Sequence, residues 1–235
     1  MTAEPKLYVP KKLLKLDLAC GQTPEAGFEG VDLRAPNAQH KVDLFKFPFP
    51  WEDSSVEAIH CSHFAEHIPA REVEERDLIT RCPDCYAVQP KNVPEGDLGY
   101  AHVVDAKCKD LIIPKPNPFP FLGQDFLFAF FDECHRILTP GGIMKVIVPC
   151  GRSNRGFWDP THRRFFMAET FLYLSKAWLK ANNLDHYNVR CDFEVNVVPT
   201  IPMDLSVLHD EVQSRRINTE WNAVYDWHAT LKAIK

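Results

Sequence analysis

Two carboxylates near the start of the sequence flank a glycine turn, an arrangement suited to a nucleoside-bearing cofactor. Asp17 and Asp32 each end a short apolar run, and the tight turn Cys20-Gly21 lies between them. In open α/β sheets ligands bind at the carboxyl ends of the strands, where an acid after the second strand accepts hydrogen bonds from ribose hydroxyls. The turn lacks the GxGxxG pattern and the chain has no phosphate-binding lysine loop, which disfavours a nicotinamide or nucleotide enzyme.

A second group of reactive side chains follows the apolar run Val56–Cys61. His63, Glu66 and His67 are candidate bases, needed only if a bound acceptor must lose a proton, and His63 and His67 are our catalytic candidates. The alternative is that Glu66 and His67 cap or brace the edge of the sheet.

A third group lies in the segment Trp158–Phe166, which combines aromatic rings with charged side chains. Asp159, His162 and Arg163 are candidate substrate-binding residues, because Arg matches carboxylate or phosphate and His can take a proton near neutral pH. His162 is therefore also a catalytic candidate. In the alternative, Asp159 caps a turn, His162 hydrogen-bonds to it and the arginines are solvated.

The middle of the chain carries a possible structural zinc site. Cys82 and Cys85 form a CxxC pair, which His102 and Cys108 could complete as a tetrahedral set. The region is rich in proline and short of apolar periodicity, so a metal would supply the core it lacks. An ordered, metal-free lid over the active site is the alternative.

Apolar periodicity predicts the elements that position these groups. Strands are expected at Leu13–Leu18, Gly30–Leu33, Val56–Cys61 and Ile143–Val148. Helices are expected at Asp125–Leu138, ended by Thr139-Pro140-Gly141-Gly142, and at Ala168–Lys180. A period of two from Trp221 to Leu231 predicts a half-buried antiparallel strand, with Tyr187–Val198 as its partner.

Composition indicates a soluble, cytoplasmic protein of ordinary globular character. The chain has 235 residues, 45% hydrophobic and 25% charged, with a net charge of −5. It lacks an apolar run of membrane-spanning length and a signal peptide, and its eight cysteines are irregularly spaced apart from the CxxC pair, as expected of reduced thiols. The acidic charge disfavours a nucleic-acid partner, although a local cluster of arginines at 152, 155, 163 and 164 keeps one among the alternatives.

Four segments together resemble the class I S-adenosylmethionine-dependent methyltransferases. They are, in chain order, Leu13–Leu33, His40–Ile68, Phe131–Pro149 and Trp158–Phe166. The resemblance implies an α/β fold: a Rossmann-like, doubly wound, mostly parallel sheet with an antiparallel C-terminal strand pair. It implies one domain over residues 1–235, with residues 70–123 as an insertion that the common family core lacks.

The resemblance also implies where S-adenosylmethionine would bind. Asp32 would hold the ribose, with Leu33 beside it; Cys20, Gly21 and Gln22 would line the methionine side. The full implied cofactor set is Asp17, Ala19, Cys20, Gly21, Gln22, Asp32, Leu33, Asp43, Leu44 and Ser62. The expected activity is methyl transfer to a small metabolite, a nucleotide or a sugar intermediate. The alternative is a non-catalytic binding or scaffold protein that keeps the fold and recognises a partner through the cysteine-containing insertion.

Overall fold

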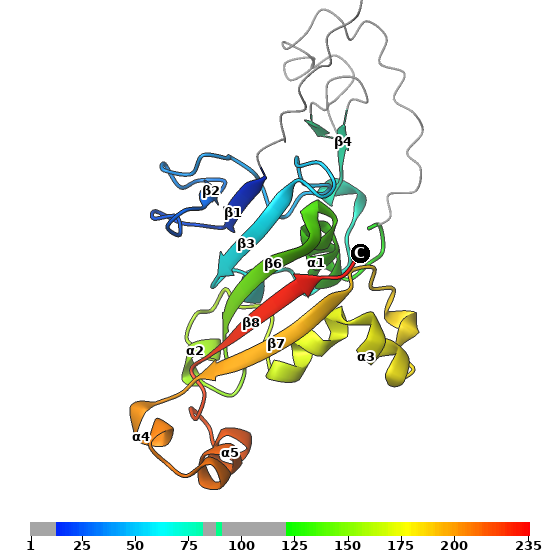
Figure 1. The fold of residues 1–235 in the computed structure, drawn as a ribbon. Coiled ribbons are helices and arrows are strands. Elements are labelled where there is room, and N and C mark those ends of the chain that lie inside the picture. Colours follow the sequence, from blue (N-terminus) through cyan, green and yellow to red (C-terminus); the bar gives the residue numbers. More distant parts are fainter. Residues whose placement is uncertain (1–12, 82–87, 91–120) are drawn as a thin grey trace, which may run out of the picture.

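The computed structural model describes residues 13–81, 88–90 and 121–235. One six-stranded sheet runs through this part of the chain in the order β2-β1-β3-β6-β8-β7 (Figure 1). Its strands are β1 (Leu14–Leu18), β2 (Glu29–Val31), β3 (Val56–Ser62), β6 (Leu138–Pro149), β7 (Phe193–Thr200) and β8 (Asp226–Ala233). The first four strands pair in parallel, and β8 is antiparallel to both β6 and β7. The expected mostly parallel sheet with an antiparallel C-terminal pair is confirmed.

The helices that the structure describes are short, apart from α1 and α5. The full set of helices in the described ranges is η1 (Ala65–His67), η2 (Glu75–Asp77), α1 (Phe126–Ile137), α2 (Asn154–Phe157), η4 (Ala168–Leu174), α3 (Lys176–Ala181), η5 (Asp185–Tyr187), α4 (Met203–Ser206) and α5 (Asp210–Thr219). A small antiparallel pair, β4 (Ile79–Arg81) and β5 (Val88–Pro90), stands apart from the main sheet. No helix in the described ranges is long and apolar enough to cross a membrane.

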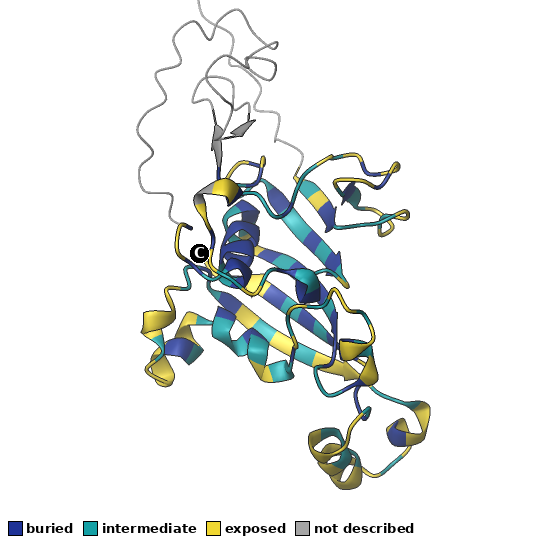
Figure 2. Ribbon diagram, turned by 180° about the vertical axis from the view of Figure 1, so that it is seen from behind, coloured by how far each residue is buried: buried dark blue, intermediate teal, exposed yellow. Residues whose placement is uncertain are grey.

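Helix α1 covers the central strands on one face of the sheet (Figure 2). Asp125 caps its first turn by accepting a hydrogen bond from the backbone N–H of Leu127 at 2.9 Å. Phe126, Phe130 and Cys134 recur at helical spacing and are fully buried. The apolar face that the sequence predicted for this helix is therefore the face that forms the core.

Two predicted elements differ from the observed ones. The helix expected at Ala168–Lys180 is divided into η4 and α3, because Ser175 is extended (φ −107°, ψ 117°) and its side chain starts α3 by accepting from Trp178 N. The C-terminal alternation becomes a strand only from Asp226 onward. The partner strand expected at Tyr187–Val198 is observed at Phe193–Thr200 and so includes Pro199, which is tolerated because β7 is an edge strand that pairs only with β8.

A buried ion pair attaches the segment after β2 to helix α1. Glu133, with no exposed surface, accepts hydrogen bonds from Arg136 at 2.6 and 2.8 Å and from the N–H of Phe49 at 2.6 Å. Arg136 also donates to the carbonyl oxygens of Phe49 and Trp51 and to the carboxylate of Asp53. The stretch from Phe49 to Asp53, which forms no helix or strand, is thus fixed by charge-assisted hydrogen bonds.

Replacing Glu133 by Ala should reduce the free energy of unfolding by about 3–5 kcal/mol, since it leaves the Phe49 N–H unpaired and removes the buried partner of Arg136, which keeps only the exposed carboxylate of Asp53. Urea denaturation at neutral pH measures the loss. Glu220→Ala, which breaks an exposed pair with Arg216 in and beside α5, is the matched control and should cost no more than about 1 kcal/mol. Equal effects of the two substitutions would contradict the role given to Glu133.

A second polar pair joins β1 to β3. Asp17 and His60 are direct neighbours in the register, and Asp17 Oδ1 lies 2.7 Å from His60 Nδ1. The other oxygen of Asp17 accepts the N–H of Glu25 at 2.8 Å. The hydrogen bond that His60 donates to Asp17 raises the pKa of His60 above its ordinary value, against the opposing effect of burial.

Because the pKa of His60 is raised on folding, its contribution to stability is complete below the pKa of an unfolded histidine, about 6.5, and is lost as the pH rises through the folded value. The difference in unfolding free energy between the wild type and His60→Gln should therefore be larger at pH 6 than at pH 8.5. Urea denaturation at the two pH values tests this. A difference that stays constant or grows with pH would contradict the assignment.

Candidate functional site

The sheet contains a switch point, at which the direction in which successive strands are added to the sheet reverses. From β1 the chain passes to β2 on one side and then to β3 on the other, so the ends of β1 and β3 lie at a topological switch point, the place where ligands bind in open α/β sheets. The chain turns sharply at both ends. Ala19 and Gly21 after β1 and His63 after β3 have positive φ values of 56°, 57° and 53°.

Asp32 follows β2 at this edge and is held by backbone donors. Its Oδ1 accepts from Arg34 N at 2.7 Å and Ala35 N at 2.8 Å, and its Oδ2 accepts from Gly21 N at 3.3 Å. Burial opposes ionisation, but these N–H groups outweigh it, so the pKa of Asp32 is lowered. The residue therefore presents a fixed, negatively charged carboxylate next to the turn at Gly21.

The thiol of Cys20 serves packing in this turn. Burial and the charges of Asp17 and Asp32 raise the pKa of Cys20, so the thiol stays neutral and is a poor nucleophile. A Cβ at Gly30 would come within 2.7 Å of Cys20 Sγ and 2.6 Å of Pro24 Cγ. Glycine at position 30 is thus what allows the turn to lie against β2.

The other predicted cofactor residues lie along the same stretch of chain, with different degrees of access. Leu33 is 52% exposed and Gln22 is exposed. Asp43 is half-buried and accepts the N–H of Phe45 at 2.9 Å, and Ser62 is half-buried at the end of β3. Leu44, by contrast, is 5% exposed and belongs to the hydrophobic core.

The turn after β3 contains a buried carboxylate. Glu66 in η1 is 1% exposed, and its Oε1 lies 3.4 Å from His63 Nδ1. Hydrogen bonding to Glu66 raises the pKa of His63, against the opposing effect of burial. The second oxygen, Oε2, is buried and has no hydrogen-bond partner within the described ranges.

The segment after β6 is joined to η1 through the backbone. The main-chain oxygen of Glu66 accepts the N–H groups of Arg163 at 2.7 Å and Arg164 at 3.0 Å. This contact brings the rings of His67 and His162 together, with centroids 4.8 Å apart at an angle of 77°. The second and third groups of reactive side chains predicted from the sequence therefore meet in one place.

Both histidine rings are held by hydrogen bonds of their Nδ1 atoms. His162 Nδ1 lies 2.9 Å from the carbonyl oxygen of Gly156. His67 Nδ1 lies 3.0 Å from Thr161 Oγ1, which donates to Asp159 Oδ1 at 2.7 Å. Hydrogen bonds from Thr161 lower the pKa of Asp159. The turn cap expected of Asp159 is present: its carboxylate accepts from Thr161, and its main-chain oxygen accepts the N–H of His162 at 3.2 Å, whereas the ring of His162 bonds to Gly156.

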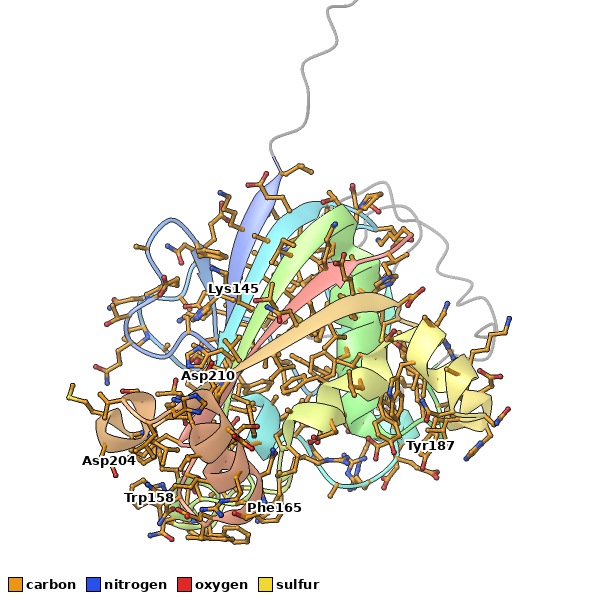
Figure 3. All side chains as sticks on the ribbon, turned by 60° about the horizontal axis from the view of Figure 1, so that its bottom comes forward. Lys145, Trp158, Phe165, Tyr187, Asp204 and Asp210 are labelled. Atoms are coloured by element: carbon orange, nitrogen blue, oxygen red, sulfur yellow. The ribbon has the colours of Figure 1, made fainter. Side chains whose placement is uncertain are left out.

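Two cavities open at this place and share His67 as a wall. The smaller, of about 240 Å³, is lined by His63, Glu66, His67, Pro149, Arg155, Trp158, Asp159 and His162. The larger, of about 490 Å³, is lined by Phe45, His67, Pro69, Ala70, Arg71, Thr161 and Arg163. Trp158 is 71% exposed and lies with Phe165 at the end of the molecule that carries α4 and α5 (Figure 3).

Three of the four arginines considered from the sequence have structural partners. Arg152 donates to the carbonyl oxygens of Ile217 and Asn218, Arg155 pairs with Asp226, and Arg164 pairs with Asp125. Arg163 donates only to nearby carbonyl oxygens and, within the described ranges, pairs with no carboxylate. Its guanidinium group is therefore the one of the four that is available to an anionic ligand.

The brace made by Arg164 was missed from the sequence, as was the stacking of Phe157 on Phe165 at 4.5 Å. Adjacent arginines carry no signal that separates their roles. The predicted zinc ligands lie outside the described residues. They are Cys82, Cys85, His102 and Cys108.

No family model matches the chain, and no curated protein matches it. Among solved structures it is similar to a SAM-dependent methyltransferase from Archaeoglobus fulgidus, with 16% identity, 94% of this chain and 87% of that chain covered, and a TM-score of 0.49. It is also similar to an S-adenosylmethionine-dependent methyltransferase from Mesorhizobium loti, with 13% identity, coverage of 95% and 93%, and a TM-score of 0.39.

A SAM-dependent methyltransferase from Aquifex aeolicus matches at 10% identity, with coverage of 94% and 82% and a TM-score of 0.41. Because these sequence identities and TM-scores are low, the fold is assigned from the order of the strands in the sheet. That order has five strands running in one direction (β2, β1, β3, β6 and β7), a switch point between β1 and β3, and one antiparallel strand, β8, inserted between β6 and β7. The chain therefore has a Rossmann-like α/β fold, with a mostly parallel sheet and an antiparallel C-terminal strand pair.

Proposed function

We propose that the protein binds S-adenosylmethionine at the carboxyl edge of β1, β2 and β3 and transfers its methyl group to a small acceptor. The observation that carries the proposal is the ionised carboxylate of Asp32, fixed beside the Gly21 turn at the switch point of the sheet. A carboxylate held in this position is suited to accept both hydroxyls of a ribose.

The rest of the cofactor would lie along the edge of the sheet between the turns that follow β1 and β3. Cys20, Gly21 and Gln22 would contact the methionine part, and Asp43 and Ser62 would flank the adenine and the sulfonium. Asp17 would act mainly through the turn, because its two oxygens already bind His60 and the N–H of Glu25. Leu44 would support the pocket from the core.

The acceptor would occupy the two cavities that meet at His67. Methyl transfer from a sulfonium is an in-line displacement, so the principal requirement is to place the acceptor atom against the methyl group. Arg163 and Asp159 would position a polar or anionic acceptor, and Phe45 supplies an apolar wall. His63, His67 and His162 line these cavities as candidate bases for an acceptor that must lose a proton.

Binding of the cofactor can be tested without knowing the acceptor. S-adenosylmethionine and its demethylated product should each raise the thermal unfolding temperature of the full-length protein. A ligand at 100 times its Kd stabilises the folded state by about 2.7 kcal/mol, which differential scanning fluorimetry detects. No shift with either compound at millimolar concentration would overturn the proposal.

Asp32→Asn should weaken binding of the demethylated product about 10- to 100-fold, because hydrogen bonds to a charged group contribute about 1.5–3 kcal/mol. Isothermal titration calorimetry measures the change. Asp204→Asn removes an equal charge from the exposed helix α4 and should leave the affinity unaltered. If both variants bind as the wild type does, Asp32 does not hold the ribose.

A further inference from the structure

We propose that Glu66, His67 and His162 form a binding site for a divalent transition-metal ion. Each residue offers one ligand atom, and the three atoms lie within 4.8 Å of one another. Ligands around a tetrahedral zinc ion, at bond lengths of about 2.0–2.1 Å, are separated by about 3.3 Å. Small side-chain rotations therefore suffice to close the three atoms around an ion.

The state of the Glu66 carboxylate provides an independent indication of a missing ligand. The side chain is 1% exposed, and Oε1 is engaged by His63 at 3.4 Å. Oε2 is also buried but has no hydrogen-bond partner in the part of the chain that the structure describes. A buried, unpaired carboxylate oxygen costs free energy, and a cation would remove that cost.

The hydrogen bonds of the two histidines select the tautomer that a metal requires. The Gly156 carbonyl oxygen can only accept, so His162 Nδ1 must carry the proton. The Thr161 hydroxyl proton is donated to Asp159, so His67 Nδ1 must likewise donate to Thr161 Oγ1. In both neutral rings Nε2 is then unprotonated and offers a lone pair.

Such outer hydrogen bonds are typical of metal-binding histidines, which usually donate their second ring N–H to a carbonyl or a carboxylate-linked group. The geometry is also fixed from the backbone, because Arg163 N and Arg164 N hold the His162 segment against Glu66 O. The ligands thus come from two chain segments that are already joined before any ion binds.

Two histidines and one carboxylate favour a borderline ion such as Zn²⁺ or Co²⁺ over Mg²⁺ or Ca²⁺, which prefer oxygen ligands. Three protein ligands leave a position for water or for an oxygen atom of a bound compound. All three residues line the 240 Å³ cavity, and His67 also lines the larger one. An ion here would present its open position to the space proposed for the acceptor.

The metal site goes beyond the proposed methyl transfer and does not depend on it. A histidine whose Nε2 binds an ion cannot use that atom to remove a proton. With the ion bound, His67 and His162 would be ligands, and His63 would remain the candidate base. Metal binding is measured without cofactor or acceptor, so failure of one proposal leaves the other standing.

The test uses full-length protein with Cys82→Ser and Cys85→Ser, freed of metal by chelation, because those thiols could bind the same ions. Titration with Co²⁺ should show about one ion bound per chain, with weak visible absorption and no thiolate charge-transfer band. Calorimetry with Zn²⁺ should give the same stoichiometry. No binding of either ion by this protein would overturn the proposal.

Two substitutions in this background test the proposed ligands, and a third serves as the control. Glu66→Gln and His162→Ala should each weaken Zn²⁺ binding at least about 10- to 100-fold, as loss of a metal-supporting group does. His186→Ala, an exposed histidine in η5, is the control and should bind as the parent does. Circular dichroism and urea denaturation verify that each variant is folded. Unchanged affinity in both Glu66→Gln and His162→Ala would place the ion elsewhere and refute the site.

Discussion

The main-chain oxygen of Glu66 is the point on which the geometry of the candidate site depends. It accepts two backbone N–H groups from the segment after β6, at 2.7 and 3.0 Å. Backbone bonds of this kind fix the relative position of two loops more firmly than contacts between exposed side chains, because no rotatable side chain intervenes. Every candidate in the second and third groups, from His63 to Arg163, lies on one of these two loops. Arg164 strengthens the junction by donating to the Pro69 carbonyl oxygen and pairing with Asp125.

Much of the fold could be predicted from the sequence, because a helix or strand with one buried face carries apolar residues at a regular spacing. The apolar spacing of Asp125–Leu138 predicted α1 within one residue at each end, and the alternation near the C-terminus predicted β8 and its antiparallel neighbour. The parallel order of the strands places His162 and the turn after β3 at one edge of the sheet, since the carboxyl ends of parallel strands lie together. The direct approach of His162 to that turn has no pattern in the sequence.

The remaining features depend on interactions that leave no local pattern. The break at Ser175 arises because this serine caps α3 and does not continue the preceding helix. The spacing of apolar residues gives no sign of such a cap. The roles of Arg163 and Arg164 differ because one faces a cavity and the other faces Asp125. The buried oxygen of Glu66 is similarly a consequence of packing between segments far apart in the chain.

The connection between β1 and β2 is too short to contain a crossover helix, and this explains why one face of the sheet is uncovered and polar. Helices α1 and α3 lie on one face, whereas in the described ranges no helix covers the other (Figures 1 and 2). On this second face Lys145 and Thr230 are at least partly exposed and border a hollow of about 370 Å³ with His60 and His228. A strand with only one covered face must alternate apolar and polar residues, and β8 does so. No helix of the described ranges lies above the Asp17–His60 pair, which provides a side-chain contact between β1 and β3 next to the turn that carries the proposed cofactor site.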